Sequence, residues 1–181
     1  MGLFDQLPDF LMTERLRLRP WVEADASSYR ELWLERDPRS VRVIDPDGRP
    51  TVADLRDKIG SHLAAKASAG FGLMVVESRI EKNFIGYCGL IGRNETPDEP
   101  EVAYELLRSA QGRGYATEAV RAVRDAAATA GRTRLWAGVR SWNTASLHVL
   151  DKLGFVPSGH ISLDPERGDT VFMTCRLHRA T

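Results

Sequence analysis

Apolar residues alternate with other residues over positions 101–106 and then change to a helical spacing. Within 101–106 every second residue is Val, Tyr or Leu, which predicts a strand. Positions 111–114 interrupt the alternation with two glycines. From Ala116 to Ala130 apolar residues recur every three or four positions, which predicts a helix over roughly 115–130. The sequence therefore predicts a strand, a tight glycine turn and a helix in succession.

The same two periodicities place the other elements of the chain. The predicted strands cover positions 15–20, 71–77, 84–91, 101–106, 135–139 and 171–177, with a further strand starting at 155–157. The predicted helices begin near Glu23, at Thr51, near Tyr115, and at Asn143 or Thr144. The resulting order is strand, two helices, three strands, helix, strand, helix and two strands. This order predicts one α/β domain with a mixed sheet and helices on both faces.

Two stretches lie outside these elements. Residues 1–12 form a mixed, proline-containing lead-in, which we expect either to be loosely ordered or to lie draped on the domain. Residues 37–50 are rich in Pro, Gly and Asp, which predicts a loop. In the first strand, Arg15, Arg17 and Arg19 alternate with apolar residues. We interpret this row of arginines as a solvated strand face.

Composition excludes several classes of protein. Lys and Arg together number 25, as do Asp and Glu, so the formal net charge is zero. A zero net charge argues against a nucleic-acid binder that relies on phosphate electrostatics. No apolar run approaches the roughly 20 residues that span a bilayer, and the N-terminus shows no signal-peptide pattern. We therefore expect a cytoplasmic protein that binds neither nucleic acid nor membrane.

The cysteines and histidines do not form a recognisable metal site. Cys88 and Cys175 are the only cysteines, and both lie in apolar, strand-like runs. We interpret both as small buried hydrophobic residues. The four histidines are scattered without the spacing of metal ligands, so we expect no metal.

The glycine turn before the helix at Tyr115 has the features of an anion site. The first amides of a helix lack an intrahelical partner, and the helix dipole adds partial positive charge there. Gly112 and Gly114 allow a positive φ and a close approach of the backbone to a phosphate. The alternative is a plain strand-to-helix turn in which the glycines serve geometry alone. The turn by itself leaves both interpretations open.

Three blocks of sequence resemble one known family. Gln111-x-x-Gly114-x-Ala116, directly after the strand that carries Glu101 and Tyr104, looks like the acetyl-CoA pyrophosphate loop of the GNAT superfamily of N-acetyltransferases. The string from Gln111 to Ala119, together with Thr13-Glu-Arg-Leu-Arg-Leu-Arg-Pro20, resembles the ribosomal-protein N-terminal (Rim-type) branch. Asn143-x-x-Ser146 and Lys152-Leu-Gly-Phe155 match that branch's later cofactor helix. The resemblance implies a GNAT domain over residues 13–181 with a mixed, mostly antiparallel sheet.

The resemblance also implies a site for acetyl-CoA. The pyrophosphate would bind the backbone amides of the turn, and the pantetheine arm would run along the strand edge near Leu106 and Leu107. The implied cofactor residues are Leu106, Leu107, Gln111, Gly112, Arg113, Gly114, Tyr115, Ala116, Thr117, Asn143 and Ser146. Arg113 is equally well explained as an exposed turn arginine. Asn143 could be a helix N-cap, a pantetheine contact, or both.

Acetyl transfer also needs a base and a leaving group. We expect Glu101 to be the catalytic base, because the resemblance places a carboxylate at this strand position in several GNAT enzymes. Glu105 is the second candidate, and Glu101 could instead be an ordinary exposed carboxylate. Many family members carry a Tyr where this chain has Leu150, so Ser146 is our candidate donor to the leaving thiolate. We interpret Glu118 as structural, since an acid in a first helical turn complements the dipole.

We therefore predict an acetyl-CoA-dependent N-acetyltransferase that transfers the acetyl group directly to a primary amine within a ternary complex. The acceptor would be a protein N-terminal α-amine or a small-molecule amine. Cofactor motif and fold do not choose between these two. The alternative is a non-catalytic acyl-CoA-binding or regulatory module, which the missing Tyr at Leu150 would suit. The sequence is compatible with a monomer or a homodimer.

Overall fold

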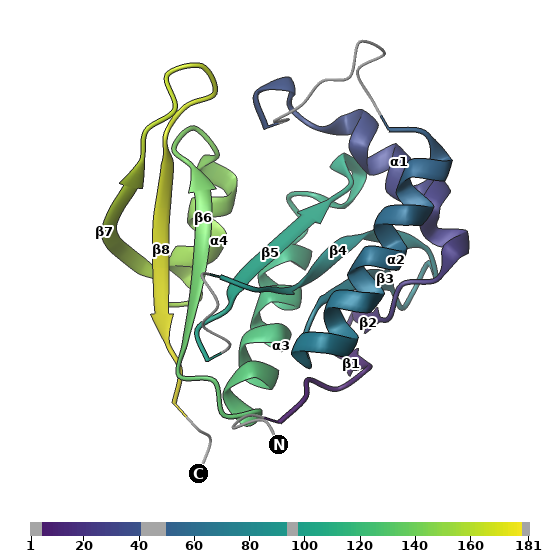
Figure 1. Cartoon of the computed structure of the whole chain (residues 1–181), viewed down its shortest axis with the longest axis horizontal. Coiled ribbons are helices and arrows are strands. Elements are labelled where there is room, and N and C mark those ends of the chain that lie inside the picture. The colour runs from purple at the N-terminus through teal and green to yellow at the C-terminus, as the bar shows by residue number, and fades with distance from the viewer. Residues whose placement is uncertain (1–4, 41–49, 94–97, 179–181) are drawn as a thin grey trace.

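The computed structural model describes residues 5–40, 50–93 and 98–178, which form one sheet with helices on both of its faces (Figure 1). The strands are β1 Leu11–Met12, β2 Leu16–Arg19, β3 Leu73–Ser78, β4 Phe84–Ile91, β5 Glu101–Leu106, β6 Arg134–Arg140, β7 Val156–Ser162 and β8 Thr170–Arg176. The helices are α1 Ala26–Glu35, α2 Val52–Ala69, α3 Tyr115–Thr129 and α4 Thr144–Lys152. The predicted order of elements is confirmed, apart from the short extra strand β1 at the start.

Within the described residues, the strand order across the sheet is β1-β2-β3-β4-β5-β6-β8-β7. Every neighbouring pair is antiparallel except β5 and β6, which are parallel. The parallel pair is possible because α3 provides the long crossover between the two strands. The prediction of a mixed, mostly antiparallel sheet is therefore confirmed.

The parallel pair β5–β6 is also where the sheet opens. These strands share one residue pair, Glu101 with Trp136, and then separate. Figure 1 shows β5 and β6 spreading apart beyond this point into a V. The opening exposes the edge of β5 that would otherwise be paired.

Two apolar clusters hold the layers together. Under α3 and α4, the larger cluster includes Val120, Val123, Leu135, Leu150 and Phe155, each at most 1% exposed. The smaller cluster packs α1 and α2 on the other face of the sheet, where its buried members are Trp21, Ala26, Tyr29, Leu32, Leu55, Ile59 and Val75. Cys88 and Cys175 are buried, as predicted.

The lead-in is draped on the domain from residue 5 onward. Leu7 is buried in the larger cluster, and its amide donates to the carbonyl of Gly70 at 2.8 Å. The amide of Asp5 donates to the carbonyl of Ala130 at 3.2 Å. β1 then pairs with β2. The predicted loop at 37–50 includes a short 3₁₀ turn at Pro38–Ser40, and residues 41–49 lie outside the described part of the chain.

The interpretation of the arginine row as a solvated face is wrong for Arg19. Its guanidinium donates to Asp25 at 2.7 Å and to Glu77 at 2.6 Å, and its side chain is 15% exposed. Sequence spacing does not reveal this enclosure, because Glu77 comes from β3, far along the chain. Arg17, at 45% exposure, matches the expectation.

Candidate active site

The start of α3 has the geometry that an anion site needs. Gly112 and Gly114 both have positive φ, at 73° and 79°, as predicted from the glycine turn. The amide of Glu118 makes the first helical bond, to the carbonyl of Gly114 at 3.1 Å. The amides of residues 115–117 precede that bond and so have no intrahelical acceptor. Their N–H groups and the positive end of the dipole are therefore available to an anion.

A cavity of about 780 Å³ lies beside this turn, at the opening of the sheet. It is lined by the end of α1, by β4 and β5, by the start of α3 and by α4. The predicted cofactor residues that line it are Leu106, Gln111, Gly112, Gly114, Tyr115, Ala116, Thr117, Asn143 and Ser146. Glu101, Leu107 and Arg113 lie outside its lining. The fold thus brings most of the predicted site residues around one space.

The register of β5 decides which backbone groups face the opening. Leu106 pairs with Gly86 of β4, and the amide of Leu107 donates to the carbonyl of Ile85 at 2.9 Å. In an antiparallel ladder this pattern makes Leu106 a non-hydrogen-bonded pair residue, so its own N–H and C=O point away from β4. The side chain of Gln111 already donates to the Leu106 carbonyl at 2.9 Å. The amide of Leu106, rather than that of Leu107, therefore faces the opening.

Asn143 and Arg113 both have structural partners. The Asn143 side chain caps α4 by accepting from the amide of Ser146 at 3.2 Å. Arg113 lies 3.6 Å from Glu81 and stacks over the ring of Tyr115 at 5.0 Å from its centroid. Asn143 is thus an N-cap that also lines the cavity, whereas Arg113 has the geometry of a turn arginine.

The two candidate bases on β5 have different surroundings. Glu105 lines the cavity, and the Arg36 guanidinium donates to both of its oxygens, with Nε at 2.7 Å and 2.9 Å. The Tyr87 hydroxyl adds a third donor at 3.1 Å. Burial, followed by the charge of Glu105, raises the pKa of Tyr87, so its hydroxyl stays protonated. Both oxygens of Glu105 are therefore engaged by donors.

Glu101 lies at the vertex of the opening. Its Oε1 accepts from the amide of Gly138 on β6 at 3.1 Å. In a regular parallel ladder that amide would pair with the backbone of β5, but the strands separate here, and the carboxylate replaces the missing acceptor. Within the described residues, the other oxygen of Glu101 has no hydrogen-bond partner.

On α4, Ser146 lines the cavity, and Leu150 is fully buried in the core. Tyr104 of β5 reaches across the opening and donates its hydroxyl to the Ser146 carbonyl at 3.2 Å. Burial raises the pKa of Tyr104 to about 12, so this hydroxyl is protonated at neutral pH. Tyr104 therefore places a phenol in the cavity of a chain that lacks one at position 150.

Among the described residues, no group of three or more His, Cys, Asp or Glu side chains is arranged to hold a metal ion. None of the described helices is both long and apolar enough to cross a membrane.

Comparison with known protein families identifies the family of this chain. The model of the acetyltransferase (GNAT) domain family matches residues 15–156, which is most of the chain. The chain belongs to the GNAT acetyltransferase family. As a GNAT enzyme it is an acyltransferase that uses acetyl-CoA as co-substrate. The resemblance inferred from the glycine turn and the later blocks is confirmed.

Individual relatives agree with this assignment. An uncharacterised N-acetyltransferase, p20, of Bacillus licheniformis is 31% identical over 153 residues, covering 82% of this chain and 83% of p20. The structure of RimL, a ribosomal L7/L12 α-N-protein acetyltransferase in complex with CoA, has a TM-score of 0.80 at 16% identity, covering 97% of this chain and 100% of RimL. The acetyl-CoA complex of yncA from Salmonella typhimurium has a TM-score of 0.69 at 19% identity, covering 92% and 96%.

The lining of this GNAT cavity also includes residues that the sequence analysis did not name as site residues, and three of them donate hydrogen bonds to predicted site residues. They are Arg36, Tyr87 and Tyr104, of which Tyr104 was recognised only as a strand residue. A signal for Tyr87 exists, because β4 and β5 were predicted and Tyr87 pairs directly with Glu105 in their register. Arg36 has no such local signal, since it follows α1 and meets Glu105 only in the folded chain.

Proposed function

We propose that this GNAT enzyme transfers the acetyl group directly to a primary amine, which is either a protein N-terminal α-amine or a small-molecule amine. The observation that supports this proposal most strongly is the single cavity that joins the start of α3 to the end of α1. One end offers the amides of residues 112–117 to the pyrophosphate of acetyl-CoA. The other end carries charged groups of both signs, the carboxylates of Glu35, Asp37 and Glu105 and the guanidinium groups of Arg36 and Arg108, and is where we place the acceptor.

The transfer step needs few chemical groups. The amine lone pair attacks the thioester carbonyl, a C–N bond forms, and the C–S bond breaks. The amine loses one proton to a base, and the thiolate leaves with the bonding electrons and then takes a proton. A thiol pKa of about 8.5 makes the thiolate a fair leaving group, so a hydrogen bond can suffice in place of a strong acid.

Glu101 is the base in this proposal, and it acts through a water molecule because it lies outside the lining of the cavity. Its second oxygen has no described partner, and it lies at the vertex where β5 and β6 separate. Glu105 is less suited, because Arg36 and Tyr87 occupy both of its oxygens. We assign Glu105 to hold Arg36 at the acceptor end. The Ser146 hydroxyl remains the proposed donor to the thiolate, and Tyr104 lies beside it.

The experiment is thiol release from acetyl-CoA across a panel of amines. The panel contains peptides that begin with Ala, Ser or Met, together with polyamines and aminoglycosides. The peptides are included because a similar structure is named as a ribosomal L7/L12 α-N-protein acetyltransferase. The polyamines and aminoglycosides test the alternative, a small-molecule acceptor. Turnover of one amine class with an N-acetylated product supports the proposal. Acetylation of hydroxyl or thiol acceptors with no amine turned over would contradict it.

A further inference from the structure

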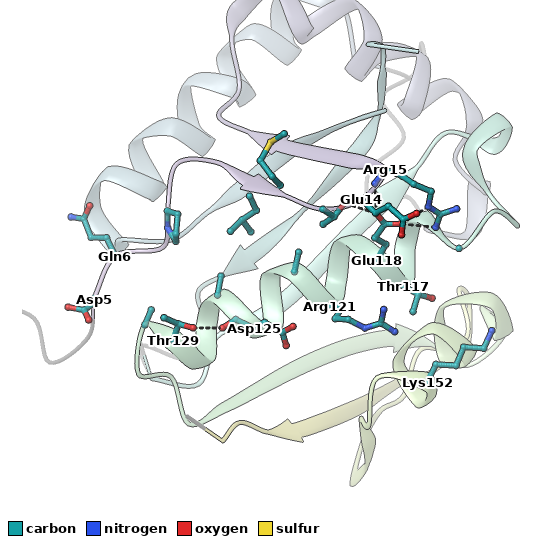
Figure 2. A pocket seen from close by; sticks show the side chains of 18 residues that line it. Asp5, Gln6, Glu14, Arg15, Thr117, Glu118, Arg121, Asp125, Thr129 and Lys152 are labelled. Carbon is teal, nitrogen blue, oxygen red and sulfur yellow. Dashed lines mark hydrogen bonds and ion pairs between the residues drawn. The ribbon is translucent and has the colours of Figure 1, made fainter. Parts of the chain in front are cut away.

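Thr13 and Arg15, near the beginning of the chain, bind the first turn of α3 through hydrogen bonds to Glu118. A second cavity, an open groove of about 1080 Å³, runs between the lead-in and the outer face of α3 (Figure 2). Gly114, Thr117 and Lys152 line both this groove and the cavity at the sheet opening. The first turn of α3 is therefore a wall between the two spaces. Arg15 and Glu118 lie on the groove side of that wall.

Glu118 collects four donors from one short segment. The Thr13 hydroxyl donates to Oε1 at 2.5 Å, and the Arg15 amide donates to the same oxygen at 2.9 Å. The Arg15 guanidinium binds Oε2 through Nε at 2.7 Å and NH2 at 2.6 Å. Figure 2 shows Arg15 and Glu118 facing each other at the right-hand end of the groove. We call Thr13, Arg15 and Glu118 the clasp.

The clasp also touches the glycine turn itself. NH1 of Arg15 donates to the carbonyl of Arg113 at 3.0 Å, and the guanidinium lies 4.7 Å from the centroid of the Tyr115 ring. In a trans peptide the carbonyl of one residue and the N–H of the next point in opposite directions. Fixing the Arg113 carbonyl toward Arg15 therefore turns the amide of Gly114 away from the groove. Gly114 also lines the cavity at the sheet opening.

We infer that Arg15 and Glu118 are positioning residues for the coenzyme: Glu118 orients Arg15, and Arg15 orients the peptide between Arg113 and Gly114 so that its amide faces the pyrophosphate. This inference rests on the cofactor site proposed above. Neither side chain touches the substrate or the reacting atoms. The clasp gives Arg15, which directly precedes β2, a role that its place in the arginine row did not indicate.

Electrostatics and positioning predict opposite effects for one substitution. Replacing Glu118 by Gln removes a negative charge close to the proposed phosphate site. If only Coulomb repulsion mattered, its removal would tighten CoA binding. If Glu118 acts by orienting Arg15, the same change releases the guanidinium and the turn, and CoA binding weakens. The sign of the change in CoA affinity therefore separates the two explanations.

The test measures CoA dissociation constants by calorimetry, together with kcat and the KM for acetyl-CoA, on the full chain. We expect Glu118→Gln and Arg15→Lys each to raise the Kd and KM about tenfold while kcat changes less than about twofold, the loss expected of a charge-assisted contact. Asp125→Asn is the matched control, because it removes one exposed charge from the same helix.

Unchanged or tighter CoA binding in either Glu118→Gln or Arg15→Lys would overturn the inference. An equal fall in kcat and in CoA affinity would also overturn it, since that indicates general damage. Should Glu118→Gln fail to fold, the conservative Arg15→Lys still decides. If the unmodified chain does not bind CoA, the cofactor site itself is wrong and the inference fails with it, which is a separate and recognisable result.

Discussion

At the scale of single residues, identical side chains have different roles because of their neighbours. Glu101 and Glu105 lie on the same face of β5, yet one accepts a single backbone N–H and the other accepts from Arg36 and Tyr87. Sequence reasoning named both as candidate bases, and it could not rank them from partners that lie on other strands and on the segment after α1. The register and the opening of the sheet supply that ranking.

Replacing Glu101 by Gln tests its role as the base. We expect kcat to fall about hundredfold, the size of a typical general-base contribution. CoA affinity should stay unchanged, because Glu101 lies outside the lining of the cofactor cavity. Steady-state kinetics measures kcat, and calorimetry measures the affinity for CoA. Glu105→Gln is the comparison, and a larger fall in kcat for that variant would transfer the role to Glu105.

His62 should make stability sensitive to acid. Burial beside Tyr29 and Trp21, and then the charge of Lys58, lower the pKa of His62 to about 4. Between pH 6.5 and 4 the unfolded chain therefore binds a proton that the native His62 does not, so stability falls as the pH decreases through this window. Urea unfolding at several pH values measures the slope.

The variant His62→Gln should flatten that pH dependence, because Gln does not titrate. His178→Gln is the control, since His178 is exposed near the end of the described chain. An undiminished slope in His62→Gln would show that other groups cause the acid sensitivity.

At the scale of elements, local patterns predicted nearly all of the strands and helices. The Thr51 cap is an example. Its hydroxyl accepts from the amide of Asp54 at 3.2 Å, and the Asp54 carboxylate accepts from the amide of Thr51 at 2.7 Å. Such signals lie within one turn of chain and are visible in sequence. The short strand β1 was missed, because two residues are too few for a periodic pattern.

Removing the α2 cap should cost a measurable part of its stability. Thr51→Ala leaves the amide of Asp54 without its partner, and we expect the free energy of unfolding to drop by about 1 kcal/mol. Thr51→Ser retains the hydroxyl and should lose much less. Denaturant unfolding of the three chains measures the difference. Equal stability of Thr51→Ala and the unmodified chain would show that the capping box does not contribute.

At the scale of the whole molecule, the opening between β5 and β6 organises the site. The parallel pair ends after Glu101 and Trp136, and the cavity lies where the two strands separate. Sequence predicted the residues of the glycine turn and of α4, because each forms a contiguous motif. It did not predict the clasp of Thr13, Arg15 and Glu118, because its two halves are about a hundred residues apart.

Binding of CoA should stabilise the entire fold. A ligand that binds the native state alone adds about 2.7 kcal/mol at a hundred times its Kd. We therefore expect the Tm of the chain to rise with CoA concentration, and to rise less for Glu118→Gln at equal concentration. Thermal unfolding monitored over a CoA titration measures both shifts. A Tm independent of CoA would contradict a cofactor site on the native fold.

The most direct test of the central claim is a crystal structure of this chain with CoA bound. The account predicts the pyrophosphate on the amides of residues 112–117, the pantetheine arm along the free edge of β5, and the thiol near Ser146 and Tyr104. CoA bound instead in the groove between the lead-in and α3, or along a different strand edge, would contradict it.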